Sequence, residues 1–285
     1  MNRRVYNGKI INESTRTNKK NSHSRFVIDT ILVSVACFLL LGGLFFGYRF
    51  LQESEKNEEV VQMWDEVKVV ANNVNQDNGK NEISVEVSYS TDPMDRKINW
   101  DDLLGINSDV ACWMFIPGTN IDYPVMQESK QDEQFYLYRN IYKKRFVSGS
   151  LFIPKTIDGY IDEHLLVYGH NMKNDSMFSQ LLDYKSKQFY NEHPHIYMYY
   201  PDRTEKWTIW SSYNTKENDI IYHSPYERNT DGYEDLIKSI DLNKSYSTLV
   251  TECSPSDYIL TLSTCDKVGD SSKRYVVNAV LSERQ

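Results

Sequence analysis

The feature that most constrains this chain is an apolar stretch near its beginning. Phe26 to Tyr48 reads FVIDTILVSVACFLLLGGLFFGY, and its last 19 residues, from Thr30 onward, carry no charged side chain. As a helix these 23 residues extend about 34 Å, enough to cross a hydrocarbon core of about 30 Å. A cleavable signal peptide and a buried core helix are the competing interpretations. Because the run exceeds the usual signal core of about 7 to 15 residues and continues into Arg49-Phe50-Leu51, we favour a retained membrane anchor.

Basic residues are concentrated ahead of this stretch. Residues 1–25 contain seven Lys and Arg and one acidic residue, a net charge of +6, although the whole chain of 285 residues carries −8. The positive-inside rule therefore predicts a cytoplasmic arm over 1–25 and an extracytoplasmic location for everything after Arg49. The rest of the chain carries −14. This acidity argues against a nucleic-acid-binding protein, because phosphate recognition relies on a concentrated cationic surface.

The four cysteines predict at least one free thiol outside the membrane. Cys37 lies in the apolar stretch, which leaves Cys112, Cys253 and Cys265 on the external side. Three cysteines cannot all pair with one another, even in a compartment where disulfides form. A free external cysteine is either a small buried side chain or a nucleophile.

Between the anchor and the rest of the chain, one apolar stripe predicts a stalk helix from Gln52 to Val74. Its members recur at spacings of three and four residues: Val60, Trp64, Val67, Ala71 and Val74. Polar and turn-forming residues follow, so 72–97 is interpreted as a linker with one short strand at Ile83–Tyr89. The predicted domains are thus a basic arm over 1–25, an anchor over 26–48, a helical stalk and linker over 49–95, and a globular domain over 96–285.

The globular part is predicted to be mainly β, with many short strands and few helices. The expected strands are Cys112–Ile116, Asp122–Met126, Ser150–Ile153, His164–Tyr168, His195–Tyr200, Lys206–Tyr213, Tyr258–Thr264 and Arg274–Leu281. The expected helices are Trp100–Ile106, Met177–Tyr184 and Pro225–Ile240. Without an alternation of strands and helices, this pattern indicates an antiparallel barrel or sandwich with helical insertions.

A cysteine and an arginine are expected to meet in this fold. The strand Tyr258–Thr264 runs directly into Cys265, and the next strand opens with Arg274 after eight residues. If the two strands form an antiparallel hairpin, Cys265 lies beside Arg274. A guanidinium there favours the thiolate and can steady an oxyanion on a substrate carbonyl.

A thiol nucleophile also needs a group that accepts and donates protons. Five of the six histidines follow the apolar stretch, and His170 is the best placed because the apolar strand 164–168 leads through Gly169 into it. His193 and His195 could suggest a metal, but two ligands without a third nearby favour surface or capping roles.

These motifs together resemble the sortases. Thr261-Leu262-Ser263-Thr264-Cys265 resembles the sortase TLxTC signature, with Arg274 where the family's arginine is expected. Residues 168–172 (YGHNM) resemble the segment around the sortase histidine, and residues 116–125 (IPGTNIDYPV) resemble early strands of class B sortases. The helix expected over 225–240 is also similar to class B, and the resemblance covers about residues 98–285.

Two positions depart from the class B pattern. Cys112 stands where a glycine often precedes the tryptophan, here Trp113, and is interpreted as a small buried side chain. Asp266 follows the cysteine, and its negative charge would oppose formation of a thiolate at Cys265.

The resemblance implies a sortase-like β-barrel transpeptidase, anchored in the membrane, that cleaves a C-terminal sorting signal of the NPxTx or SPxTG type on secreted proteins. Cys265 would form a thioacyl enzyme, His170 would transfer protons, and Arg274 would hold the carbonyl oxygen. Ser263 and Thr264 are expected to contact substrate, with support of the strand as the alternative. A peptidoglycan amine would accept the product, with no cofactor, no metal and no nucleic acid involved.

Two other functions stay open at the level of sequence. A cysteine hydrolase would release the same thioacyl intermediate to water, and a product assay with and without an amine acceptor distinguishes it from a transpeptidase. A non-catalytic surface-binding module would use Cys265 only structurally, and its thiol would not react with a thiol-directed electrophile.

Overall fold

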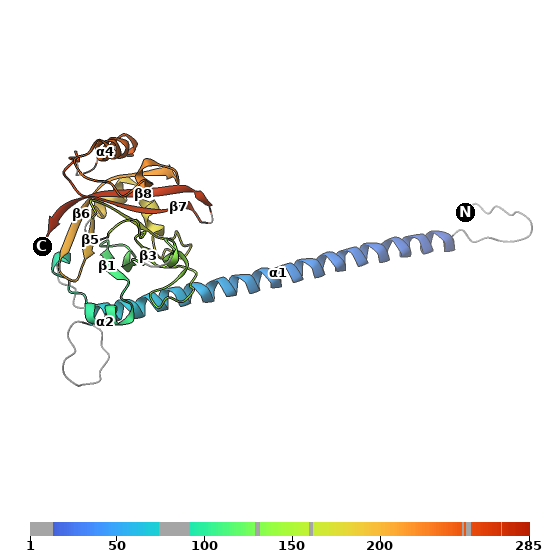
Figure 1. Ribbon diagram of the computed structural model, residues 1–285. Helices are drawn as coiled ribbons and strands as arrows, with labels where there is room; N and C mark the ends of the chain where they lie inside the picture. Colours follow the sequence, from blue (N-terminus) through green and yellow to red (C-terminus); the bar gives the residue numbers. More distant parts are fainter. Residues whose placement is uncertain are drawn as a thin grey trace, which may run out of the picture. The chain divides into compact units, whose positions relative to one another are not determined.

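The computed structural model of the protein describes most of the chain. The described residues are 14–73, 92–128, 132–159, 162–246, 248, 252–268 and 270–285. Helix α1 spans Ser14–Asn72, and from Ile31 onward it contains a stretch long and apolar enough to cross a membrane, with none of that stretch buried. The chain divides into two compact units, residues 1–58 and 59–285 (Figure 1). The predicted strand at Ile83–Tyr89 lies outside the described residues.

The second unit is built on a closed eight-stranded barrel. Its strands are β1 (Val110–Phe115), β2 (Asp122–Met126), β3 (Leu151–Phe152), β4 (His164–Tyr168), β5 (His195–Tyr199), β6 (Thr204–Lys216), β7 (Ile259–Lys267) and β8 (Asp270–Arg284). They follow one another around the barrel in the order β1-β2-β3-β4-β7-β8-β6-β5. The prediction of a mainly β barrel with helical insertions is confirmed.

Six of the eight strand pairings are antiparallel, as expected, but two are parallel. β2 pairs with β3, and β4 pairs with β7, in parallel. A parallel pair requires a long crossover, and the chain supplies one between Tyr168 and Ile259 that contains β5 and β6. Because β4 and β7 run in the same direction, the residues that follow β4 lie next to the last residues of β7.

Short helices connect or cover the strands. They are α2 (Trp100–Ile106), α3 (Lys187–Glu192), α4 (Asp231–Asn243) and the 3₁₀ helices η1 (Pro93–Asp95), η2 (Phe135–Tyr138), η3 (Ser179–Lys185) and η4 (Ile220–Tyr222). The helix predicted over Met177–Tyr184 is the 3₁₀ helix η3. The helix predicted from Pro225 begins six residues later, because the Thr230 hydroxyl accepts from the Tyr233 amide and caps it there.

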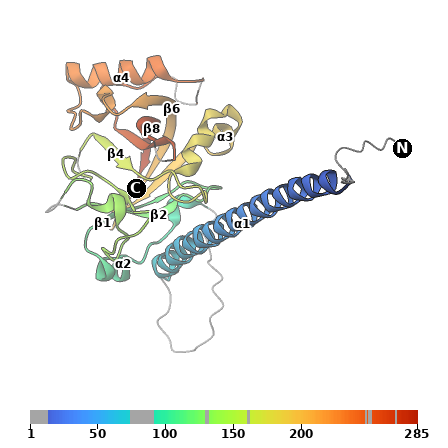
Figure 2. The same cartoon turned by 90° about the vertical axis from the view of Figure 1, so that its right-hand side faces the viewer.

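Helix α4 gives the barrel a second apolar core on its outer face (Figure 2). Tyr233, Leu236 and Ile240 are fully buried in it. Successive residues of β7 face opposite sides, so Ile259 packs in this outer core and Leu260 inside the barrel. The strand that leads to Cys265 is therefore fixed on both faces.

The end of α1 belongs to the barrel unit rather than to a separable stalk. Val60, Trp64, Val67 and Ala71 are buried, and the Trp64 indole donates to the Ser148 hydroxyl at 3.2 Å. The compact unit accordingly begins at Glu59, earlier than the boundary predicted near residue 96. The spacing of these apolar residues predicted a helix. It did not predict that the barrel unit covers them.

A buried polar cluster ties the end of α1 to the barrel. The Arg96 guanidinium donates to Asp122 at 2.7 Å and to the Asn72 side chain at 3.0 Å. The Trp113 indole donates to the same Asp122 carboxylate at 2.6 Å. Because Arg96 and Asp122 are both buried, loss of either partner would leave an uncompensated charge, which typically costs about 3–5 kcal/mol.

We therefore expect a chain that begins at residue 96 to be less stable than one that begins near residue 50. The shorter chain loses the Trp64 contact and the Asn72 partner of Arg96, and removal of a buried tryptophan alone costs about 3–5 kcal/mol. Thermal unfolding of the two chains, with Trp64→Ala in the longer one, measures this. Equal unfolding midpoints for the three proteins would show that the apolar stripe of α1 does not contribute to stability.

Candidate active site

Cys265 and Arg274 form the centre of the candidate site. They are directly opposite each other in the antiparallel register of β7 and β8, which confirms the hairpin expected from the sequence. The Arg274 Nη1 atom donates to the Cys265 Sγ atom at 2.8 Å, and both residues are half-buried. A guanidinium at this distance stabilises negative charge on the sulfur.

The other two cysteines of the barrel unit, Cys112 and Cys253, are poor nucleophiles. All four cysteines of the chain are free, and Cys112 is fully buried, as the sequence analysis expected. Burial raises the pKa of the Cys112 thiol well above its ordinary value. Burial and the nearby Asp257 raise the pKa of Cys253 to about 12. Both thiols are therefore protonated near neutral pH, which leaves Cys265 as the thiol of the barrel unit suited to nucleophilic chemistry.

His170 lies at the neighbouring strand end. It follows β4, whose partner in the parallel register is β7, so that Tyr168 is opposite Ser263. The His170 Nε2 atom is 2.7 Å from the Leu137 carbonyl oxygen, and the ring packs against Tyr138 with centroids 5.5 Å apart. A carbonyl only accepts, so Nε2 carries the proton and Nδ1 is the basic nitrogen.

The electrostatic environment keeps His170 neutral. Burial lowers its pKa below the ordinary value of about 6.5, and the Arg274 cation lowers it further, while the bond to the Leu137 carbonyl opposes both. Near neutral pH the residue therefore has an unprotonated nitrogen ready to accept a proton.

Backbone and amide contacts join the two strand ends. The Gly169 amide donates to the Ser263 carbonyl at 3.1 Å, and the Asn171 side chain donates to the Cys265 carbonyl at 3.0 Å. Asn171 was not identified from the sequence as a site residue. Its position directly after His170 was the signal that could have identified it.

Ser263 and Thr264 lie at the site, but their hydroxyls have partners within the protein. Ser263 bonds to the Tyr222 hydroxyl at 2.9 Å, and Thr264 donates to the Gly169 carbonyl at 2.9 Å. Both residues are buried. These contacts support the strand, and direct contact of either hydroxyl with substrate stays a prediction. Tyr222, which the sequence analysis did not identify, also stacks on Tyr168 with ring centroids 6.1 Å apart.

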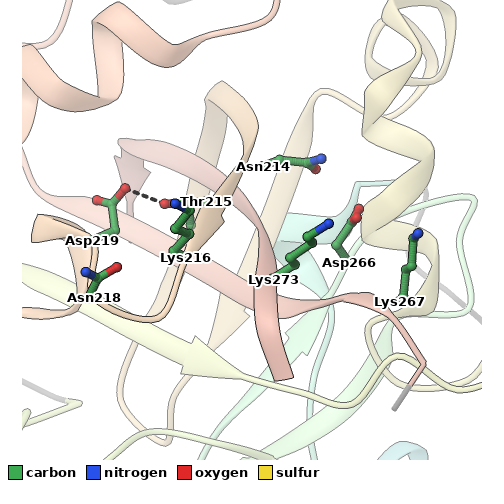
Figure 3. A pocket seen from close by; sticks show the side chains of 8 residues that line it. All are labelled: Asn214, Thr215, Lys216, Asn218, Asp219, Asp266, Lys267 and Lys273. Carbon is green, nitrogen blue, oxygen red and sulfur yellow. Dashed lines mark hydrogen bonds between the residues drawn. The ribbon is translucent and has the colours of Figure 1, made fainter. Parts of the chain in front are cut away.

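The negative charge of Asp266 has a counter-ion. The Lys185 Nζ atom, at the end of η3, lies 2.6 Å from the Asp266 carboxylate. Asp266 also lines a surface recess of about 530 Å³ together with Lys216, Lys267 and Lys273 (Figure 3). The contact with Lys185 offsets the charge of the carboxylate, so its effect on the neighbouring Cys265 is reduced.

His193 and His195 do not lie at this site. The His193 ring is 2.8 Å from the Pro117 carbonyl oxygen, and its backbone amide caps α3. His195 contacts the Thr208 hydroxyl in the β5–β6 pair. Among the described residues there is no group of three or more His, Cys, Asp or Glu side chains that could hold a metal ion.

The ion pair yields a first prediction for Cys265. Lys185→Met leaves Asp266 without its closest counter-ion, so alkylation of Cys265 by iodoacetamide should slow about two- to fivefold, as expected for a partly exposed ion pair. Asp266→Asn in the same background should restore the rate. A double variant that stays as slow as Lys185→Met would show that Lys185 acts by packing instead.

The pKa of His170 yields a second prediction. In an NMR titration His170 should titrate below pH 6.5, and Arg274→Gln should raise its midpoint because a nearby cation is removed. Lys273→Gln is the matched control, since it removes the same charge from the adjacent residue on the opposite face of β8. Equal shifts in both variants would contradict a specific effect of Arg274.

Comparison with known proteins agrees with this geometry. A family model for the sortase domain matches residues 114–282. Sortase B of Listeria monocytogenes is 29% identical over 242 residues, which cover 82% of this chain and 89% of that protein. Sortase B of Staphylococcus aureus is 28% identical over 184 residues, 63% of this chain and 73% of that protein.

Solved structures lead to the same family. The X-ray structure of Clostridium perfringens sortase B matches with a TM-score of 0.59 and 31% identity, covering 64% of this chain and 99% of that one. The matched family region includes six complete strands of the barrel, β2 to β7, and both Cys265 and Arg274. The chain therefore belongs to the sortase family of transpeptidases and, by its relatives, to class B.

Proposed function

We propose that this protein cleaves a C-terminal sorting signal of the NPxTx or SPxTG type on secreted proteins and joins them to an amine of peptidoglycan. Cys265 is the nucleophile, His170 the proton carrier, and Arg274 the group that steadies the reacting oxygen. The observation that carries the proposal is the 2.8 Å contact between Arg274 Nη1 and Cys265 Sγ. This contact places a fixed cation next to a free thiol near the end of a rigid strand.

In the acylation step, these three residues account for each proton that moves and each bond that forms or breaks. The thiol proton moves to His170 Nδ1, and the sulfur attacks the carbonyl carbon of the signal's threonine. As the C–N bond breaks, His170 returns the proton to the leaving amine, and a thioester remains on Cys265. The neutral state of His170 supports this order, because an imidazolium could not accept the first proton.

The second step reverses the first with a new amine. The incoming amine attacks the thioester carbonyl and gives a proton to His170, which passes it to the sulfur as the C–S bond breaks and so restores the Cys265 thiol. In both steps negative charge develops on the carbonyl oxygen. The planar guanidinium of Arg274 carries several donors, so it can contact the sulfur and this oxygen together.

Membrane anchoring is part of the same proposal. The apolar segment of α1 is the single span, the basic arm over 1–25 is cytoplasmic, and the catalytic domain is extracellular. A tether suits this chemistry because secreted substrates and lipid-linked peptidoglycan precursors both occur at the membrane surface. No residue proposed for chemistry lies before residue 96.

Cys265→Ala is expected to abolish peptide cleavage while the fold is retained, because only one sulfur atom is removed. The loss should reach about 10⁴-fold or more, as for other removed nucleophiles. Peptides carrying NPxTx, SPxTG and LPxTG motifs, each with and without an amine acceptor, provide the assay. Residual turnover near that of the parent would refute the assignment, and product that forms only with water would favour a hydrolase.

Arg274→Lys is expected to lose most of the activity, by about 10²-fold, although the positive charge is kept. An ammonium lacks the planar fork that serves sulfur and oxygen together. Cleavage rates and thermal unfolding of the two proteins should be compared under the same conditions. Parent-like cleavage by the lysine variant would reduce the role of Arg274 to a general electrostatic effect.

A further inference from the structure

A small basic hairpin lies between η2 and β3 in the barrel unit. We call residues 138–147 (YRNIYKKRFV) the basic tip. An isolated antiparallel bridge joins Arg139 to Arg145, and the Asn140 side chain accepts from the amides of Tyr142 and Lys144. Ile141 anchors the hairpin in the core, where its carbonyl accepts from Asn107 at 2.7 Å. The tip is therefore a fixed structure with a defined outer surface.

The side chains on this surface combine cations with exposed apolar groups. The segment contains four basic residues and no acidic one, within a chain whose net charge is −8. Residues 142–145 (YKKR) are all exposed, as is Val147. Lys143 pairs with Asp109 at 2.9 Å, and its side chain is still 48% exposed. Basic residues with aromatic neighbours are the combination that binds at the headgroup region of anionic membranes.

The tip lies beside the part of the unit that is nearest in sequence to the anchor. Ser148, directly after the tip, accepts a hydrogen bond from Trp64 of α1. Val60 is the first buried residue of that helix stripe. It comes twelve positions after Tyr48, where the apolar stretch ends. Even a fully extended chain of this length spans at most about 43 Å. The tether thus keeps this edge of the unit within reach of a membrane surface.

We propose that the basic tip docks on the anionic lipid headgroups of the membrane in which the chain is anchored. This inference rests on the anchoring proposed above, and it does not depend on the assignment of the catalytic residues. Lys143, Lys144 and Arg145 supply the charge, and Tyr142 and Val147 enter the interface between headgroups and acyl chains. Each cation near such a surface strengthens docking by about fivefold.

Docking would also orient the candidate active site. Tyr138, the first residue of the tip, and Leu137, directly before it, both contact His170. A tip held at the lipid surface therefore keeps the His170 side of the barrel near the membrane, where a membrane-bound substrate would arrive.

The test uses the full-length chain in lipid nanodiscs. One set contains only phosphatidylcholine, and the other also contains phosphatidylglycerol. Acetylation of lysines by an N-hydroxysuccinimide ester is followed by mass spectrometry, with the exposed Lys187 of α3 as the internal reference. We expect Lys143 and Lys144 to react at least threefold more slowly in the anionic discs, Lys187 to be unchanged, and the difference to disappear in high salt.

A charge-matched pair of variants isolates the tip. We expect the combined variant Tyr142→Ser, Arg145→Ser to lose the slowing at Lys143 and Lys144. Lys238→Ser, which also removes one cation but from α4, should keep it. Thermal unfolding verifies that both variants fold.

Each remaining outcome counts against the inference. Equal reactivity of Lys143 and Lys144 in both lipids overturns docking but leaves the anchoring intact. Equal slowing in neutral discs would mean that the tip packs against protein, such as a second copy of the chain. A chain that does not co-elute with either kind of disc overturns the anchoring, and the docking with it.

Discussion

The parallel pairing of β4 with β7 is the constraint on which the rest of the site depends. Both strands run toward the same edge of the barrel, so His170, just after β4, and Cys265, near the end of β7, are neighbours although 95 positions apart in sequence. The antiparallel partner of β7 then contributes Arg274 from the other side. An antiparallel arrangement of β4 and β7 would have placed the histidine at the opposite end of the barrel.

The two-sided burial of β7 gives this arrangement its rigidity. Ile259 packs under α4 and Leu260 packs inside the barrel, so neither face of the strand is free to move. The Thr264 hydroxyl and the Asn171 amide then bind the strand end to the β4 side. A reacting sulfur benefits from such support, because displacement of about 1 Å from a productive geometry can cost two orders of magnitude in rate.

Local patterns in the sequence predicted much of the fold and the central pair of the site. The strand–turn–strand spacing was sufficient to place Cys265 beside Arg274, and the apolar strand before Gly169 was sufficient to select His170. Lys185 and Tyr222 were missed because their partners lie 81 and 41 residues away, and no local pattern encodes such a contact. The parallel pairings and the surface that covers Trp64 were missed for the same reason. These features depend on how distant segments meet rather than on the period of one segment.

The last strand of the barrel in chain order, β8, has a consequence for when the site can form. β8 lies between β6 and β7 and pairs with both, so the barrel cannot close before residues 270–284 are available. Contacts between distant segments form slowly, because the loops that they close cost entropy first. Cys265 therefore gains Arg274 as a neighbour only when β8 pairs with β7, after the seven preceding strands of the barrel are available. Until that pairing forms, the sulfur on β7 lacks the cation that stabilises its negative charge.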